Sequence, residues 1–188
     1  QHIKASYAER FVPDHATLIA TGDVSAETLL PLLESNLGSW KPTGSDKVVI
    51  PPPPVHAGKG RHIFVNKTGT SQTALMVIMP APEATSPASE PAELGSIVLG
   101  GTFTSRLNRL LREEKGYTYG ARASYGGKSN YGYLLARTNV QRDVSAPALV
   151  DLLGELEEYK GGIDQAELTK AIGSWQTDVV ESMASRRS

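Results

Sequence analysis

Residues 102–119 read TFTSRLNRLLREEKGYTY, and this stretch decides how the middle of the chain folds. Its leucines recur at positions i, i+3 and i+4, which predicts a helix over 104–115 with one apolar stripe. The members of that stripe are Leu107, Leu110 and Leu111. Gly116 then permits the left-handed backbone that commonly ends a helix. A strand is expected to begin at Tyr119, so the stretch predicts a helix that passes almost directly into a sheet.

The segments on either side of this stretch also carry strand and helix patterns. The predicted elements are strands over 61–66 and 73–79, a helix over 87–103, hairpin strands over 119–125 and 131–140 joined by a turn at 126–130, and two closing helices. A capping box, Asp164 answered by Glu167, is expected to open the second closing helix. This order predicts an α+β fold in which helices pack on one face of a mainly antiparallel sheet.

The first forty residues are predicted to form a smaller helix-strand-helix unit. One helix is expected to end at Phe11, residues 16–21 have the pattern of a strand, and Ser25 is a good cap for a second helix. Residues 41–60 are rich in proline and glycine, with four consecutive prolines at 51–54, which favours a semi-rigid linker. The expected organisation is a first-domain segment at 1–40, a linker at 41–60 and a second domain at 61–188.

The composition excludes several classes of protein. The chain has 188 residues, a net charge of −1 and 39% hydrophobic residues, so it can build a core and has no overall charge that would draw it to nucleic acid. No apolar run approaches the roughly 20 residues needed to span a bilayer. Cysteine is absent, which excludes disulfides, thiolate zinc sites and cysteine nucleophiles.

Three other motifs have residues that can form sites. The histidines are His2, His15, His56 and His62. None belongs to an HEXXH or HXXEH pattern, so a histidine metal site is not expected. The run GGTFTS at 100–105 lacks the lysine and the spacing of a phosphate loop, and a junction between helices is the favoured interpretation. Arg106, Arg109 and Arg112 recur every three residues and are expected to form a solvated helix face rather than a nucleic-acid contact.

One pair of residues indicates binding chemistry. Arg112 lies in the last predicted turn of its helix, and Tyr119 opens the strand that follows. The end of a helix and the start of the next strand lie close together, so the two side chains can converge on one point. Arginine supplies a fork of N–H donors and tyrosine one O–H donor, which suit a peptide carbonyl or a developing oxyanion. From these residues alone, ordinary packing and surface solvation stay open as the alternative.

The run GGTFTSRLN at 100–108, followed by LREEKGYTY at 111–119, resembles the non-catalytic C-terminal domain of the pitrilysin-like zinc peptidases. That family includes mitochondrial processing peptidase, insulin-degrading enzyme and many bacterial zinc proteases. YAERFVPD at 7–14 and IATGDV at 19–24 resemble the final strand region of the family's first domain, so the resemblance covers nearly the whole chain. It implies that Arg112 and Tyr119 are the pair that holds the substrate backbone across from the zinc.

The resemblance also implies where the metal lies. In such enzymes an HXXEH helix and a downstream glutamate of the N-terminal domain hold zinc, and a metal-activated water attacks the scissile carbonyl. No HXXEH occurs in this sequence, so zinc is expected in the full enzyme and none is expected to be bound by this chain. The implied partners are an HXXEH-bearing N-terminal half or partner subunit and a peptide substrate. By itself the chain is expected to be inactive.

Several alternatives stay open. A chain that starts inside what resembles the tail of the first domain favours a piece of one longer polypeptide over a separate subunit. A structural or assembly subunit without peptidase activity is the second functional hypothesis, and a generic peptide-binding module that uses a sheet edge is the third. Homodimers and heterodimers are both compatible with the sequence. Bacterial relatives imply a periplasmic location, with the cytoplasm as the alternative.

Overall fold

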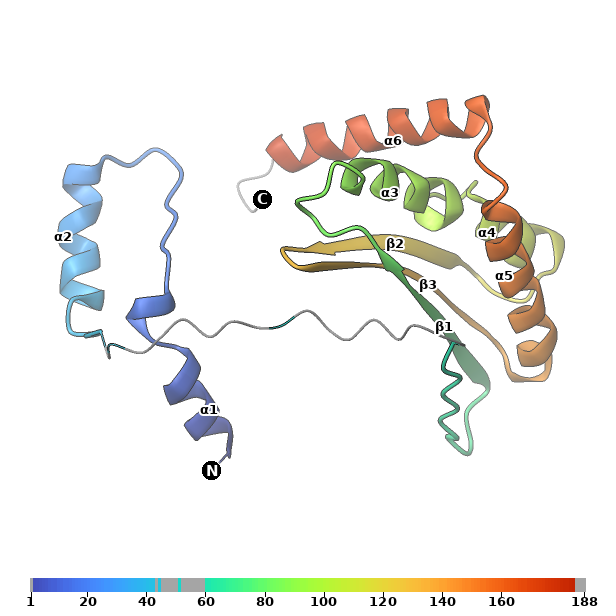
Figure 1. Ribbon diagram of the computed structural model, residues 1–188, viewed down its shortest axis with the longest axis horizontal. Coiled ribbons are helices and arrows are strands. Elements are labelled where there is room, and N and C mark those ends of the chain that lie inside the picture. The colour runs from blue at the N-terminus through green and yellow to red at the C-terminus, as the bar shows by residue number, and fades with distance from the viewer. Residues whose placement is uncertain (1, 43, 45–50, 52–59, 185–188) are drawn as a thin grey trace. The chain divides into compact units, whose positions relative to one another are not determined.

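The computed structural model describes residues 2–42, 44, 51 and 60–184. The chain divides into two compact units, Gln1–Pro51 and Pro52–Ser188, and each is described by itself (Figure 1). Most of the linker predicted over 41–60, including Pro52, Pro53, Pro54 and His56, lies outside the described residues. Within the described ranges, no helix is both long and apolar enough to cross a membrane.

Three helical elements occur in the described residues of the first unit. These are α1 (His2–Arg10), the short 3-10 helix η1 (Pro13–His15) and α2 (Ala26–Leu37). The predicted cap of α2 is confirmed, because the Ser25 hydroxyl oxygen accepts a hydrogen bond from the Thr28 N–H at 3.3 Å. The strand predicted over 16–21 is not formed. A strand needs a hydrogen-bonded neighbour, and the described part of this unit contains no second strand that could pair with it.

The apolar side chains of the first unit are mostly exposed to solvent. Val12 is buried, whereas Ile3 is 86% exposed, Ile19 82% and Leu30 62%. Scattered exposed apolar residues are ordinary, but a whole unit with almost no buried hydrophobic residue has no core of its own. Within its described residues, this unit therefore lacks the surface against which its apolar residues would be buried.

The second unit is built on a three-stranded antiparallel sheet (Figure 1). Its strands are β1 (Gln72–Ala81), β2 (Ala121–Lys128) and β3 (Tyr131–Gln141), in the order β1-β3-β2. The predicted hairpin is confirmed, but its turn consists of residues 129–130 rather than 126–130, and β2 begins at Ala121 rather than at Tyr119. The strand predicted over 61–66 is not formed, and Ile63, Phe64 and Val65 are 74%, 88% and 81% exposed. Its apolar pattern lacks a pairing strand within the described residues, as in the first unit.

The helices of the second unit gather on one side of this sheet (Figure 1). They are α3 (Ser89–Ser96), η2 (Ile97–Gly101), α4 (Arg106–Asn108), η3 (Arg109–Glu114), the short η4 (Arg142–Val144), α5 (Ser145–Tyr159) and α6 (Gln165–Ala184). Burial alternates along β1 and the first half of β2, so one face of the sheet is covered and the other is open. This architecture confirms the predicted α+β class.

The core lies between the helices and the covered face of the sheet. Its fully buried members include Leu99, Leu107, Leu111, Ala136 and Leu152. The backbone of η2 approaches β2 so closely that a Cβ at Gly100 would lie 2.2 Å from the Ala123 backbone nitrogen. Only glycine permits this contact, which is the physical reason for a glycine at the junction between η2 and α4. The helix–helix junction predicted at 100–105 is thereby confirmed.

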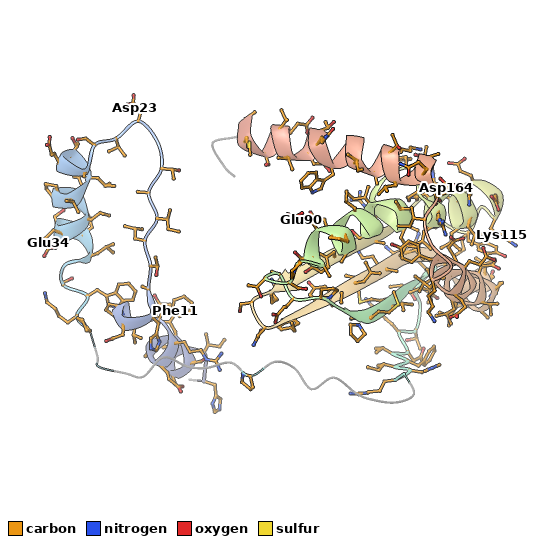
Figure 2. All side chains as sticks on the ribbon, turned by 45° about the horizontal axis from the view of Figure 1, so that its top comes forward. Phe11, Asp23, Glu34, Glu90, Lys115 and Asp164 are labelled. Carbon is orange, nitrogen blue, oxygen red and sulfur yellow. The ribbon has the colours of Figure 1, made fainter. Side chains whose placement is uncertain are left out.

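Two predicted helix boundaries are confirmed in detail. Gly116 adopts φ +63°, and its N–H donates to the Arg112 carbonyl at 3.2 Å, as expected for a left-handed stop after η3. At the start of α6, the Glu167 N–H donates to Asp164 Oδ1 at 2.8 Å, and the Asp164 N–H donates to Glu167 Oε2 at 3.1 Å. This reciprocal pair is the capping box (Asp164 is labelled in Figure 2).

The prediction that Arg106 belongs to a solvated helix face is wrong. Its side chain is only 15% exposed and makes a bidentate pair with Glu167, with Nε and Nη2 each 2.6 Å from a carboxylate oxygen. Nη2 also donates to the Gly162 carbonyl at 3.0 Å, and Glu155 lies 4.0 Å from Nη1. Arg106 therefore ties α4 to the start of α6, because the packing of α5 and α6 closes over a position that spacing alone marks as exposed.

Asn108 holds strand β2 to the helices. Its Nδ2 donates to the carbonyls of Thr102 and Ala121, both at 2.8 Å, and its Oδ1 accepts from the Ala121 N–H at 2.9 Å. The amide side chain thus pairs both backbone groups of Ala121, as a neighbouring strand would. Because Asn108 is 6% exposed, water cannot replace these bonds easily.

Replacing Asn108 by alanine should therefore lower the free energy of unfolding by about 3 kcal/mol, since it leaves the buried N–H and carbonyl of Ala121 unpaired, whereas the Thr102 carbonyl keeps its bonds from Ser105. Chemical denaturation measures the loss. Asn139→Ala, on the open face of the sheet, is the matched control and should change stability by less than about 0.5 kcal/mol. Equal stability of the two variants would contradict the role given to the Asn108 amide.

The Arg106–Glu167 pair predicts how stability depends on pH. The hydrogen bond from Arg106 lowers the pKa of Glu167 in the folded protein. The stability that this pair adds is therefore complete above the pKa of a glutamate in the unfolded chain, about 4.3, and it is lost as the pH falls through the folded-state pKa. Burial raises the pKa of Glu155, so protonation of that carboxyl in acid has the opposite, partly offsetting effect.

We expect Glu167→Gln to lower stability at neutral pH by about 1–3 kcal/mol and to flatten the acid limb of the stability profile. Unfolding midpoints measured between neutral pH and acid test this. Glu157→Gln removes a carboxylate whose pair with Lys160 is largely exposed, and it should leave the profile nearly unchanged. An acid limb as steep in Glu167→Gln as in the wild type would show that the pair does not control it.

Candidate functional site

Arg112 lies in η3, two residues before that helix ends. The Cζ atom of its guanidinium lies 4.7 Å from the centroid of the Phe103 ring, a cation–π distance, and Nη1 lies 2.7 Å from Glu113 Oε1. The side chain is 34% exposed, so the ring supports one side of the guanidinium while part of it faces solvent. The N–H of Lys115 bonds back to the Leu110 carbonyl, and wide helical turns of this kind are frequent at functional sites.

Tyr119 occupies the short connection between η3 and β2, and it is 92% exposed. Its two neighbours are anchored on β3. The Thr118 hydroxyl lies 2.7 Å from the Asn139 carbonyl and accepts from the Gly120 N–H at 3.1 Å. The Thr138 hydroxyl lies 3.0 Å from both the Thr118 hydroxyl and the Gly120 carbonyl. The backbone on both sides of Tyr119 is therefore held against the sheet, while its phenol faces solvent.

A cavity of about 540 Å³ opens beside these residues, a volume within the range of ligand sites. Its walls come from the ends of the three strands and from the loop that follows η2. Lining side chains that can contact a ligand include Met76, Phe103, Tyr119, Arg122 and Arg137. Phe103 is near both predicted site residues. Its side chain lines the cavity together with Tyr119, and its ring makes the cation–π contact with the guanidinium of Arg112.

Sequence reasoning did not identify Phe103, Arg122 or Arg137 as site residues. A large aromatic residue two positions after a pair of glycines, at a junction between helices, is the feature of the sequence that could have indicated Phe103, which is 70% exposed in the structure. Arg122 and Arg137 are fifteen positions apart in the chain and meet only through the pairing of β2 with β3. The predicted hairpin contains both residues, but its longer turn at 126–130 implies another register, so the sequence did not place them opposite each other.

Zinc does not fit the described residues. Cysteine is absent from the chain, and no three His, Asp or Glu side chains converge anywhere in the described ranges. A protein zinc site needs three or four such donors around one point. The chemistry that the described cavity offers is hydrogen-bond donation by tyrosine and arginine, charge from arginine, and apolar contact with Phe103 and Met76.

The sequence comparison identifies a family. The model described as the peptidase M16 inactive domain matches residues 1–174 of the chain. No curated protein matches the chain.

Solved structures share the fold. A peptidase M16 inactive domain from Pseudomonas fluorescens is 28% identical, with a TM-score of 0.55, and the match covers 60% of this chain and 29% of that chain. A protease from Helicobacter pylori is 24% identical, with a TM-score of 0.69, covering 87% of this chain and 40% of that one. A "putative zinc protease" from Bordetella pertussis Tohama I is 23% identical, with a TM-score of 0.54, and the match covers 62% of this chain and 64% of that one. The chain thus spans less than half the length of the first two proteins.

The anchoring of Tyr119 yields a prediction. Thr118→Val should remove the hydroxyl that pairs the Gly120 N–H and lower stability by about 1–2 kcal/mol. Hydrogen exchange at the Gly120 amide should become faster, because that amide loses its acceptor. Thr177→Val is a matched control, since the Thr177 hydroxyl bonds within its own helix on an exposed surface. Unchanged exchange at Gly120 would show that Thr118 does not hold this segment.

Proposed function

Because the chain belongs to the family of peptidase M16 inactive domains, we propose that it is the non-catalytic, substrate-binding part of a zinc metallopeptidase. In this proposal residues 61–188 form the substrate-binding domain, residues 1–40 complete the end of the peptidase domain, and residues 41–60 link the two. The observation that carries the proposal is the placement of Arg112 on Phe103, whose ring lines the same cavity as the exposed Tyr119.

Arg112 and Tyr119 act by holding the backbone of a peptide. The phenol O–H donates to one peptide carbonyl, and the guanidinium N–H groups that do not face Glu113 donate to another or to the developing oxyanion. The Phe103 ring limits the motion of the guanidinium, and the Thr118 anchor limits the motion of the tyrosine. Hydrogen-bond donors fixed in this way speed a reaction mainly by orienting the substrate and by stabilising the negative charge that develops in the transition state.

The first unit supports the domain assignment. Its side chains leave Ile3, Ile19 and Leu30 exposed, and residues 16–21 are extended without a strand partner in the described part of the unit. An apolar segment with unpaired backbone is what remains of a sheet when its neighbouring strands belong to another part of the protein. In the proposal, those strands are supplied by the HXXEH-bearing half, on the same polypeptide or on a partner subunit.

The metal belongs to that other half. The described residues of this chain offer no donor set for zinc, and the name of the Bordetella pertussis relative is the one that mentions zinc among the three proteins compared. This chain therefore binds and positions the substrate, and by itself it is inactive. A periplasmic location stays a prediction of the resemblance alone.

The pair can be tested in the enzyme that contains both halves. Arg112→Ala and Tyr119→Phe should each lower kcat/KM for a peptide by about 10- to 100-fold, because each removes a donor to the substrate. Tyr119→Phe should leave thermal unfolding nearly unchanged, because Tyr119 is 92% exposed. Arg112→Ala should lower stability only slightly, because the contacts it removes, with Phe103 and with the exposed Glu113, are weak. Steady-state kinetics and melting curves measure the two effects.

Matched variants separate a specific role from a general one. Arg109→Ala removes another exposed arginine of η3, and Tyr131→Phe removes another tyrosine hydroxyl, and both should keep wild-type kinetics. The chain alone should neither cleave peptides nor bind stoichiometric zinc in a metal analysis. Full activity of both Arg112→Ala and Tyr119→Phe would remove the pair from the mechanism and favour a structural subunit.

A further inference from the structure

The face of the sheet that the helices leave open carries two arginines in one row. The register of the strands places Arg122 of β2 directly opposite Arg137 of β3, and Arg137 directly opposite Met76 of β1. All three side chains belong to the exposed set of the alternating burial pattern. Met76 is 60% exposed, and Ile78, two residues further along β1, is 64% exposed.

The arginine pair has no compensating charge within the described residues. Neither Arg122 nor Arg137 makes an ion pair or a side-chain hydrogen bond there, although Arg106, Arg109 and Arg112 each pair with a glutamate. Like charges directly opposite each other on neighbouring strands destabilise a sheet. The pair therefore does not contribute to folding stability, and an anion bound between the two side chains would relieve the repulsion.

Both arginines line the cavity of about 540 Å³ beside Tyr119 and Phe103. No aspartate or glutamate lines it, so its charged side chains are all positive. Glu113, which bonds to Arg112 at 2.7 Å, does not line the cavity. A cavity with this charge attracts an anionic ligand, and its apolar walls at Met76 and Phe103 suit the aliphatic part of an amino-acid side chain.

We propose that this cavity binds an acidic side chain of the peptide, with Arg122 and Arg137 as the groups that recognise its carboxylate. Two guanidinium forks can each donate paired N–H bonds to a carboxylate. The proposal rests on the proposed function, because it takes the peptide to be held at Tyr119, on the rim of the same cavity. It adds the substrate class: peptides with an aspartate or glutamate near the segment that Tyr119 holds.

Calorimetric titration of short peptides into the full chain tests the inference. Three peptides are compared: one acetylated and amidated with a central glutamate, the same peptide with glutamine, and the glutamine peptide with a free C-terminal carboxylate. We expect the glutamate peptide to bind roughly three- to tenfold more tightly than the amidated glutamine peptide. The difference should shrink between about 0.02 M and about 0.2 M salt, because exposed charge pairs are screened.

The variant Arg122→Gln/Arg137→Gln should abolish this preference, so that the glutamate peptide and the amidated glutamine peptide bind with equal affinity. It should fold at least as stably as the wild type, since it removes a like-charge repulsion. The control variant Lys160→Gln/Lys170→Gln changes the net charge equally, at the C-cap of α5 and within α6, and should keep the preference.

Three results would overturn the inference. Equal affinity for the glutamate and glutamine peptides would exclude recognition of an acidic side chain while leaving the proposed function intact. A gain of the same size from the free C-terminus would assign the arginines to a terminal carboxylate instead. Absence of binding by all three peptides would overturn both the inference and the substrate-binding role.

Discussion

The second unit depends on one polar contact, the pairing of the Asn108 side chain with the backbone of Ala121. The helices and the sheet meet through leucines and alanines, and apolar packing is non-directional, so it tolerates small shifts of a strand. The Asn108 amide is directional. It fixes the start of β2 relative to α4 and, through the Thr102 carbonyl, the loop that carries Phe103. The geometry of the cavity follows from that contact.

The segment between Arg112 and Tyr119 brings a helix end close to the start of a strand because it is short. Only six residues separate Arg112 from Tyr119, and within them the chain must end a helix, reverse and begin a strand. The wide last turn of η3, the left-handed Gly116 and the Thr118 anchor accomplish this. The first two use local backbone hydrogen bonds, and the third joins the Thr118 hydroxyl to the Asn139 carbonyl of β3. None of these bonds involves the side chain of Arg112 or Tyr119. Both side chains are thereby left available for the binding role proposed for them.

Short-range sequence patterns predicted most elements of the second unit, because each of these patterns involves residues that are close together in the chain. The leucine stripe of 104–115, the glycine stop, the hairpin and the Asp164–Glu167 capping box each depend on neighbours within a few residues. The strands predicted over 16–21 and 61–66 did not form, because a strand depends on a partner that its own residues do not specify. Arg106 was misjudged for the same reason: its burial is produced by α6, sixty residues away.

The amino-acid sequence by itself determined the α+β class, the resemblance to zinc peptidases, and the candidate pair Arg112 and Tyr119, whose role stays a proposal. Those conclusions rest on short-range spacing and on motifs that are readable in one dimension. Only the tertiary structure brought Phe103 beneath Arg112 and Arg122 opposite Arg137. Contacts of that kind are set by strand register and by the packing of helices on a sheet, and distance along the chain carries no information about either.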